Sequence, residues 1–137
     1  MVAQRYAREY PRDDEGKPPD CGRAAVAVIG FDGVVLARVS WRTESPERAR
    51  VLVEGDVDHD TAPLLRAEVL EALAHRPVVC CDLRLASFLG SVGVHTLAKV
   101  HVAAAESGRT MVLAGVSGIV EQVLRATGML DVLAVEP

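Results

Sequence analysis

The sequence predicts one α/β domain, with a mixed sheet of about four to five strands and about three to four helices. Short runs of Val, Ile and Leu alternate along the chain with longer segments whose apolar residues recur at helical spacing. Half of the 137 residues are hydrophobic and only 4% are aromatic, so the core must consist mainly of aliphatic side chains. The length suits a single core.

The chain divides into a polar N-terminal segment and the domain itself. Residues 1–23 carry charges of both signs, several prolines and no hydrophobic periodicity, which predicts a flexible tail. This segment also lacks the apolar stretch of a signal peptide. Residues 24–137 are expected to form the domain.

The first part of the domain is expected to be made of strands. An apolar run at Ala24–Ile29 is followed by the turn Phe31–Gly33, because Asp-Gly favours a positive φ. Strands are then predicted at Val34–Trp41 and Ala49–Glu54, with the polar loop "RTESPER" between them. We expect these two strands to form a hairpin.

A helix and a central strand are expected next. The segment "GDVDHDTAP" leads into a helix at Leu64–Ala74, with Asp60 or Thr61 as its N-cap and Pro63 in its first turn. The continuous apolar run Val78–Leu83 is typical of a central strand that is covered on both faces.

Two more helices and a buried strand complete the pattern. One helix is predicted at Val92–Ala105, with Gly108 after its end, and the strand "TMVLAG" follows. The last helix, Gly118–Thr127, is expected to be capped by Ser117, and "MLDVLAV" to form a short strand or extended segment. Strand–helix–strand crossovers are right-handed and give parallel neighbours.

Composition and motifs exclude several classes of function. A formal net charge of −4 without a basic stripe argues against nucleic-acid binding. No apolar run reaches the roughly 18 residues of a membrane span, so direct membrane insertion is not expected. The three cysteines show no zinc-binding spacing, which favours reduced thiols and a cytoplasmic location. No nucleotide-binding motif is present, and no cofactor is predicted.

Other candidate sites are weak. Asp56, Asp58 and Asp60 alternate as in a calcium loop, but Thr61 and Ala67 stand where that loop needs glycine and glutamate. A solvated turn before a helix is the better interpretation. The stretch "GSVG" does not match the nucleophile elbow of hydrolases, and no cluster of titratable groups indicates an enzyme.

Ser91 stands at the start of the second predicted helix, between Gly90 and Gly93. The spacing alone favours a structural role, because serine is among the best N-cap residues. The same position would suit a phosphoserine, since a helix N-terminus stabilises a phosphate and a partner could detect the added charge. Both interpretations are open at this level.

Three stretches resemble a STAS domain, the fold of anti-sigma factor antagonists. They are "VLVEGDVDHDTAPLLRAEV", "PVVCCDLRLASFLGSVGVHTLAKVH" and "GRTMVLAGVSGIVEQVLRATGMLDVLAV". In that family a strand ends in G-x-[LVI]-D, a later strand ends in D-L, and D-S-[SA]-G-[LVI] opens the second helix. The resemblance extends from about Val34 to Val135.

The resemblance implies a regulatory function. It identifies Ser91 as the phospho-acceptor, Gly93 as the motif glycine and Asp58 as the aspartate after a strand. The implied partner is an anti-sigma factor that is also a serine kinase: the unphosphorylated antagonist captures it, phosphorylation breaks the complex, and a phosphatase restores binding. Two motif positions differ here, because Gly90 replaces the aspartate and Val92 replaces the second serine.

We expect the partner to contact the turn before the first helix and the start of the second. This surface comprises Asp56, Asp58, Thr61, Gly90, Ser91, Val92, Gly93, Val94 and His95. The loss of the motif aspartate leaves two hypotheses: an antagonist switched at Ser91, and a degenerate STAS module that acts as a constitutive scaffold or accessory subunit. The oligomeric state is not predicted.

Overall fold

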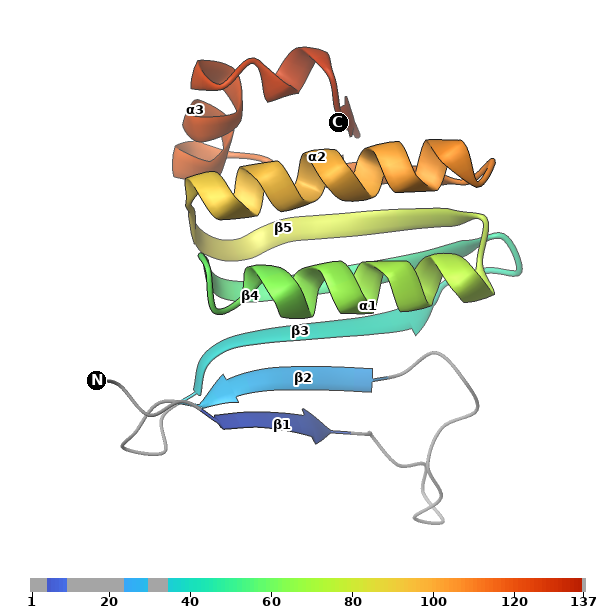
Figure 1. Ribbon diagram of the computed structural model, residues 1–137, viewed down its shortest axis with the longest axis horizontal. Helices are drawn as coiled ribbons and strands as arrows, with labels where there is room; N and C mark the ends of the chain where they lie inside the picture. Colours follow the sequence, from blue (N-terminus) through green and yellow to red (C-terminus); the bar gives the residue numbers. More distant parts are fainter. Residues whose placement is uncertain (1–4, 10–23, 30–34, 137) are drawn as a thin grey trace.

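The computed structural model describes residues 5–9, 24–29 and 35–136 (Figure 1). The strands are β1 (Arg5–Glu9), β2 (Ala24–Ile29), β3 (Val35–Thr43), β4 (Arg48–Val57), β5 (Val78–Leu89), β6 (Thr110–Ala114) and β7 (Ala134–Val135). The helices are α1 (Ala62–His75), α2 (Ser91–Glu106), α3 (Gly118–Ala126) and the short 3-10 turn η1 (Met129–Asp131).

The strands form one mixed sheet in the order β1-β2-β3-β4-β5-β6-β7. Neighbours from β1 to β4 are antiparallel, which confirms the β3–β4 hairpin, and neighbours from β4 to β7 are parallel. The predicted class, one α/β domain with a mixed sheet and three helices, is confirmed. The sheet was predicted to have four to five strands; β3 to β7 account for five, and β1 and β2 extend it to seven.

Strand β1 lies within residues 1–23, where we expected only a flexible tail, so that expectation is wrong for Arg5–Glu9. This strand pairs antiparallel with β2, which supplies the backbone partners that a short polar segment needs. The rest of the expected tail, residues 1–4 and 10–23, and the predicted turn at 31–33 lie outside the described residues.

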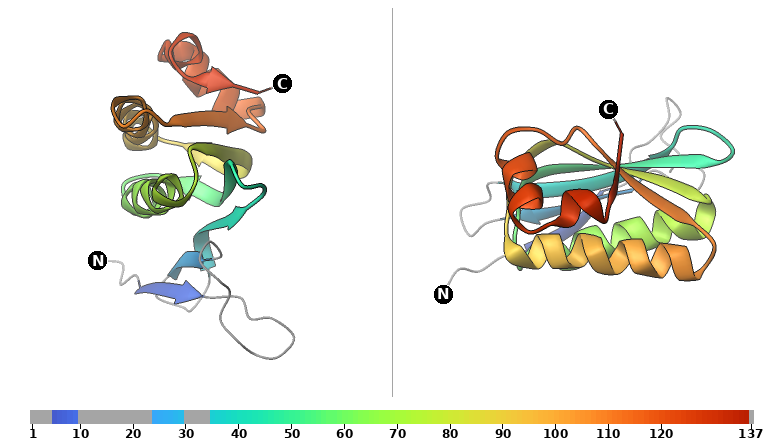
Figure 2. Two further views of the ribbon diagram at one scale, coloured as in Figure 1. Left: turned by 90° about the vertical axis from the view of Figure 1, so that its right-hand side faces the viewer. Right: turned by 90° about the horizontal axis from the view of Figure 1, so that it is seen from above.

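Helices α1 and α2 lie side by side on one face of the sheet (Figures 1 and 2). This follows from topology, because right-handed crossovers that proceed in one direction from β4 to β5 to β6 place their helices on the same side. The prediction that this strand is covered on both faces is confirmed, because Val79 to Leu83 are each at most 1% exposed, but the two faces are covered differently. The apolar run reflects one face packed on helices and one face covered by polar side chains.

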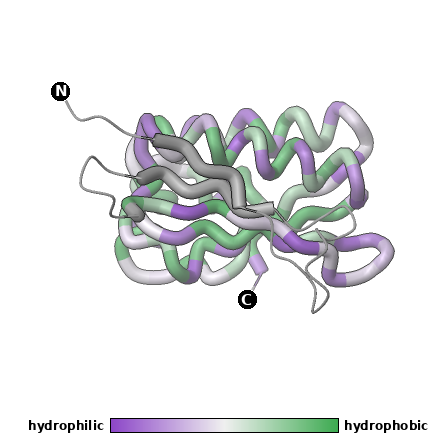
Figure 3. Tube along the Cα trace, turned by 90° about the horizontal axis from the view of Figure 1, so that it is seen from below, coloured by the Kyte–Doolittle hydropathy of each residue, from purple (hydrophilic) through white to green (hydrophobic). Residues whose placement is uncertain are grey.

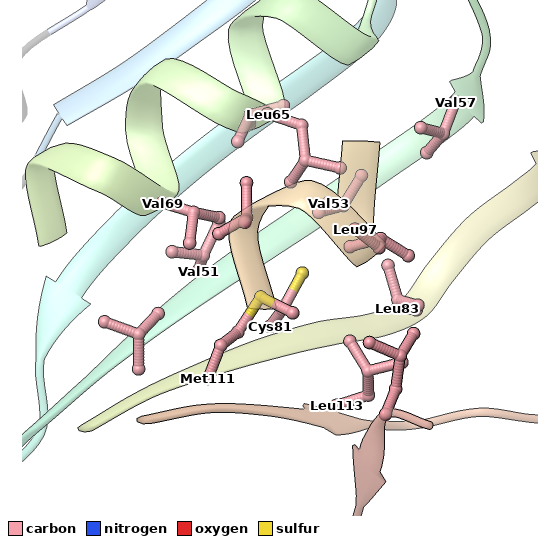
Figure 4. Packing of buried hydrophobic residues seen from close by; sticks show 14 of the residues in the cluster. Val51, Val53, Val57, Leu65, Val69, Cys81, Leu83, Leu97, Met111 and Leu113 are labelled. Carbon is pink, nitrogen blue, oxygen red and sulfur yellow. The ribbon is translucent and has the colours of Figure 1, made fainter. Parts of the chain in front are cut away.

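The core fills the space between the helices and the sheet. Leu65 and Val69 of α1 and Leu97 of α2 point toward Val53 and Leu83 of the strands, and all five are buried (Figure 4). Each fully buried side chain of this size contributes about 1.5–3 kcal/mol relative to exposure. The core cluster consists mainly of Val, Leu and Ala side chains, as the composition predicts, together with Trp41, Cys81 and Met111.

The opposite face of β4 and β5 is covered by arginine–carboxylate contacts. Arg50 binds the carboxylates of Asp82 at 2.8 Å and Glu44 at 2.9 Å, and Arg48 binds both oxygens of Glu136 at 2.6 and 2.8 Å. Asp82 is only 1% exposed. The turn between β3 and β4, which carries Glu44, is hydrophilic in Figure 3.

The site-bearing strands are longer than the sequence predicts. Strand β4 continues to Val57 and β5 to Leu89, six residues beyond the predicted end at Leu83. The extension "RLASFL" was not predicted as a strand because it is not a continuous apolar run, and several of its side chains are exposed in the structure. It is held in the sheet by pairing with the end of β4.

Candidate functional site

The carboxyl ends of β4 and β5 lie next to each other, so the turns that follow them form one surface. Val57 pairs with Leu89, and the Gly90 N–H donates to the Val57 carbonyl oxygen at 2.8 Å. This contact places the turn before α1, with Asp56 and Asp58, beside the first residues of α2. The structure therefore brings together the two segments that the sequence analysis assigned to one surface.

Helix α2 begins differently from the prediction. Gly90 is the N-cap residue: it has extended backbone angles (φ −78°, ψ 171°), and its carbonyl accepts the first helical hydrogen bond from the Val94 N–H at 3.0 Å. Ser91 is the first helical residue, its side chain is exposed, and no side chain caps the helix. The structural interpretation of Ser91 as the N-cap is thus wrong, because the glycine occupies that position.

Gly93 is required by close packing. A Cβ atom at this position would lie 2.7 Å from Leu89 Cδ1, 2.8 Å from Val57 Cγ1 and 3.0 Å from the Val57 carbonyl oxygen. Any side chain here would push the start of α2 away from the sheet. The motif glycine therefore sets how closely Ser91 approaches the end of β4.

Gly90 has no such constraint. A Cβ atom there would meet Phe88 Cε1 and the Val57 carbonyl oxygen at 3.5 Å, and Asp58 Cα at 3.9 Å. These are ordinary van der Waals distances, and the φ of −78° suits any residue. Neither the backbone angles nor the space for a Cβ atom therefore requires glycine at this position.

The turn before α1 is ordered by its own polar groups. The Asp58 carboxylate accepts the Asp60 N–H at 3.1 Å, and the Asp58 carbonyl accepts the Ala62 N–H at 2.8 Å. Thr61 occupies the predicted N-cap position, but its hydroxyl donates to the Asp56 carbonyl at 2.8 Å and does not cap the helix. With 2% exposure, Thr61 supports the turn from inside.

The nine predicted surface residues divide by exposure. Asp56, Ser91, Val92 and His95 are exposed, Asp58 and Gly90 are half-buried, and Thr61, Gly93 and Val94 are buried. A partner could therefore touch the first six, whereas the last three hold the surface in place.

Two residues of this surface were missed by the sequence analysis. Ser87 donates its hydroxyl to the Asp56 carboxylate at 2.8 Å, and the large side chain of Phe88 is 44% exposed. Both belong to the part of β5 that was not predicted as a strand. The signal that could have identified them is the stretch "SFLGSVG", in which a polar residue and an aromatic residue directly precede the helix start.

Possible cation ligands also lie near this surface. Ligand atoms of Asp58, His59 and Asp60 lie within 4.8 Å of one another. His59 is exposed, and one oxygen of Asp58 already accepts a backbone N–H. Three consecutive residues on a solvated turn commonly gather in this way without a metal, so this arrangement does not define a metal site.

Comparison with known proteins shows the family. The family described as "Mlab, STAS domain" matches residues 41–134, which is more than half of the chain, and the protein belongs to the STAS domain family. The match includes every element from the end of β3 to the start of β7. A comparison with curated protein sequences found no match.

Solved anti-sigma factor antagonists share the fold. One from Mycobacterium paratuberculosis aligns with a TM-score of 0.62 at 23% identity, covering 74% of this chain and 86% of that chain. SpoIIAA in its unphosphorylated form aligns with a TM-score of 0.61 at 17% identity, covering 72% and 88%. The phosphorylated form of SpoIIAA, a Bacillus cell fate determinant, gives 0.57 at 16% identity, covering 72% and 91%.

These comparisons confirm the resemblance seen in the sequence at the level of family and fold. They also place the end of β5 and the start of α2 inside the matched region. In the described residues, no helix has the length and apolarity that a membrane crossing requires.

Proposed function

We propose that this protein is a regulatory STAS protein of the anti-sigma factor antagonist type. In this proposal it acts in the cytoplasm, has no enzymatic activity, and binds an anti-sigma factor that is also a serine kinase. Phosphorylation of Ser91 switches the binding. The observation that carries the proposal is the position of Ser91: its side chain is exposed at the first residue of α2 and does not cap the helix. SpoIIAA, which shares the fold, has been solved in unphosphorylated and phosphorylated forms.

The expected effect of a phosphate follows from its surroundings. A phosphoserine adds close to two negative charges at neutral pH. At Ser91 the phosphate would lie at the positive end of the α2 dipole, near backbone N–H groups that have no partner within the helix. It would also add to the negative charge of Asp56 and Asp58 on the neighbouring turn. A partner with acidic groups at this contact would be repelled, and a close contact with the helix start would be blocked.

The test compares two substitutions of Ser91 in binding to the anti-sigma factor, measured by calorimetry. Ser91→Ala is expected to retain the affinity, and Ser91→Asp to weaken it by about tenfold or more, because like charges at an interface are costly. Ser117→Asp is the matched control, since Ser117 is also an exposed serine at a helix start. Equal affinity of Ser91→Ala and Ser91→Asp would exclude the switch.

A second candidate function is a constitutive scaffold or accessory subunit. The observation that favours it is Gly90, which stands where the family motif has an aspartate although a Cβ atom would fit there. Intact-mass analysis of protein from its native cell distinguishes the two, because phosphorylation adds about 80 Da. A population that stays unmodified, also after incubation with candidate kinases and ATP, supports the constitutive module.

A further inference from the structure

The pairing of β4 with β5 contains an irregularity next to Ser91. Gly55 pairs with Ala86, but the next residue, Asp56, pairs with Phe88. Ser87 is therefore an extra residue in β5 that has no counterpart on β4. This is the arrangement of a β-bulge, which redirects the side chains that follow it and is common beside functional sites.

The extra residue is held by its own side chain. The Ser87 hydroxyl donates to the Asp56 carboxylate at 2.8 Å, across the two strands and 31 residues along the sequence. Asp56 is also fixed from the other side, because its carbonyl accepts the hydroxyl of the buried Thr61 at 2.8 Å. Asp56 thus links the bulge in β5 to the turn that begins α1.

The bulge decides which side chains face the core. With the observed register, Leu89 is 1% exposed and Phe88 is 44% exposed. Side chains alternate between the two faces of a strand, so a slip by one residue would exchange them. Leu89 lies against Gly93, and Gly90 binds the carbonyl of Val57, so the start of α2 depends on this register.

We infer that Asp56 and Ser87 are positioning residues for Ser91. Their hydrogen bond fixes the bulge, and the bulge fixes the backbone from Leu89 to the first turn of α2. Asp56 therefore serves the site through its bond to Ser87, and its charge is not needed for contact with a partner. The effect of these residues on partner binding rests on the proposed function. Their effect on the backbone at the start of α2 does not require a partner.

The first measurement is amide hydrogen exchange at Gly90, whose N–H is bonded to Val57. Asp56→Ala and Ser87→Ala should each accelerate this exchange by about fivefold, the scale of one side-chain hydrogen bond. Because both remove the same bond, the double variant should show no further increase. Asp56→Asn keeps an acceptor oxygen and should exchange at nearly the wild-type rate.

Two matched substitutions control for general effects. Ser117→Ala removes an exposed serine hydroxyl at a helix start, and Asp131→Ala removes an exposed carboxylate, and neither residue takes part in the bond between Asp56 and Ser87. Neither should change the exchange at Gly90. The inference is overturned if Asp56→Asn accelerates exchange as strongly as Asp56→Ala, or if Ser87→Ala leaves the exchange unchanged.

The second measurement is binding of the anti-sigma factor by the same variants. If Asp56 acts by positioning, Asp56→Asn retains binding while Asp56→Ala and Ser87→Ala weaken it. Loss of binding in Asp56→Asn alone would show a direct charge contact and would contradict the inference. If neither the wild-type protein nor any variant binds an anti-sigma factor, the proposed function is wrong. The exchange data would still decide whether the hydrogen bond between Asp56 and Ser87 positions the start of α2.

Discussion

The two ends of the paired strands β4 and β5 use charged side chains in opposite ways. At the amino ends, arginines and carboxylates satisfy each other, as in the two-oxygen contact between Arg48 and Glu136. At the carboxyl ends, Asp56 and Asp58 bind hydroxyl and backbone N–H groups, and no arginine or lysine among the described residues contacts them. One end therefore has its charges neutralised within the molecule, and the other presents them to solvent beside Ser91.

The difference indicates that different interactions stabilise the two ends of the sheet. Charge pairs at the amino end cover the sheet face opposite α1 and α2, and through Glu136 they connect the residue after β7 to β4. The carboxyl end is fixed by close packing and by hydrogen bonds from uncharged donors, which do not offset the charge of the Asp56 and Asp58 carboxylates. Substitutions at the two ends should therefore differ in how much they change the free energy of unfolding, in the pH dependence of that change and in their effect on binding.

The largest effect is expected for packing at the carboxyl end. Gly93→Ala places a Cβ atom at 2.7–2.8 Å from Leu89 and Val57, and such overpacking typically costs about 1–3 kcal/mol of the free energy of unfolding. Gly90→Ala is the matched control, because its Cβ would meet its neighbours at 3.5 Å. Urea denaturation measures both. A Gly93→Ala variant as stable as Gly90→Ala would show that α2 can shift without cost.

The charge pair at the amino end should contribute less. Arg48 and Glu136 are partly exposed, at 29% and 32% of their side-chain surface, so solvent screens their interaction. A double-mutant cycle with Arg48→Met and Glu136→Gln should give a coupling of about 1 kcal/mol, near the upper limit for exposed pairs. The pair Arg125 and Glu121 on α3, with Arg125 70% exposed, should give a smaller coupling. Equal coupling energies for the two pairs would show that the network at the amino end stabilises the protein no more than an isolated surface pair does.

The same network predicts a pH dependence at low pH. Hydrogen bonds from Arg48 hold the pKa of Glu136 below its ordinary value. Burial raises the pKa of Glu44, but hydrogen bonds from Arg50 and Arg48 outweigh it and leave the pKa lowered. A carboxyl group whose pKa is lower in the folded state stabilises the fold above its unfolded pKa, here 4.5, and this contribution is lost as the pH falls through the folded value.

Urea denaturation at pH 7 and at pH 3 measures this loss. The wild-type protein should lose more stability over this interval than Glu136→Gln, which has no carboxyl group to titrate at that position. Asp131→Asn serves as the control, because Asp131 is exposed and its side chain forms no ion pair with another described residue. A Glu136→Gln variant with the same pH dependence as the wild type would contradict the role of the pair.

The sequence predicts the middle of each element better than its ends. Helical periodicity identified α1, α2 and α3, because each helix packs one face on the core. The second half of β5 was missed because Arg84 and Ser87 face solvent and interrupt the apolar run. Strand β1 was missed for a similar reason: its sequence is polar, and its place in the sheet depends on β2.

The site was predictable in its position but not in its contacts. Flanking glycines and the family pattern singled out Ser91, and the turn containing Asp58 was assigned to the same surface. The bond between Ser87 and Asp56 depends on a one-residue shift in strand pairing, which no local pattern in the sequence reveals. The N-cap was assigned to Ser91 because serine is favoured there, whereas the backbone places Gly90 at that position.

The smallest expected effect tests that last assignment. Loss of a serine N-cap costs about 1 kcal/mol, but Ser91 caps nothing, so Ser91→Ala should change the free energy of unfolding by less than about 0.5 kcal/mol. Thr61→Val, which removes a buried hydroxyl bonded to the Asp56 carbonyl, should cost about 1 kcal/mol. If Ser91→Ala costs as much as Thr61→Val, the hydroxyl of Ser91 is a structural group after all. A negligible cost means that the hydroxyl has no structural role, so any loss of regulation in Ser91→Ala would reflect the missing hydroxyl directly.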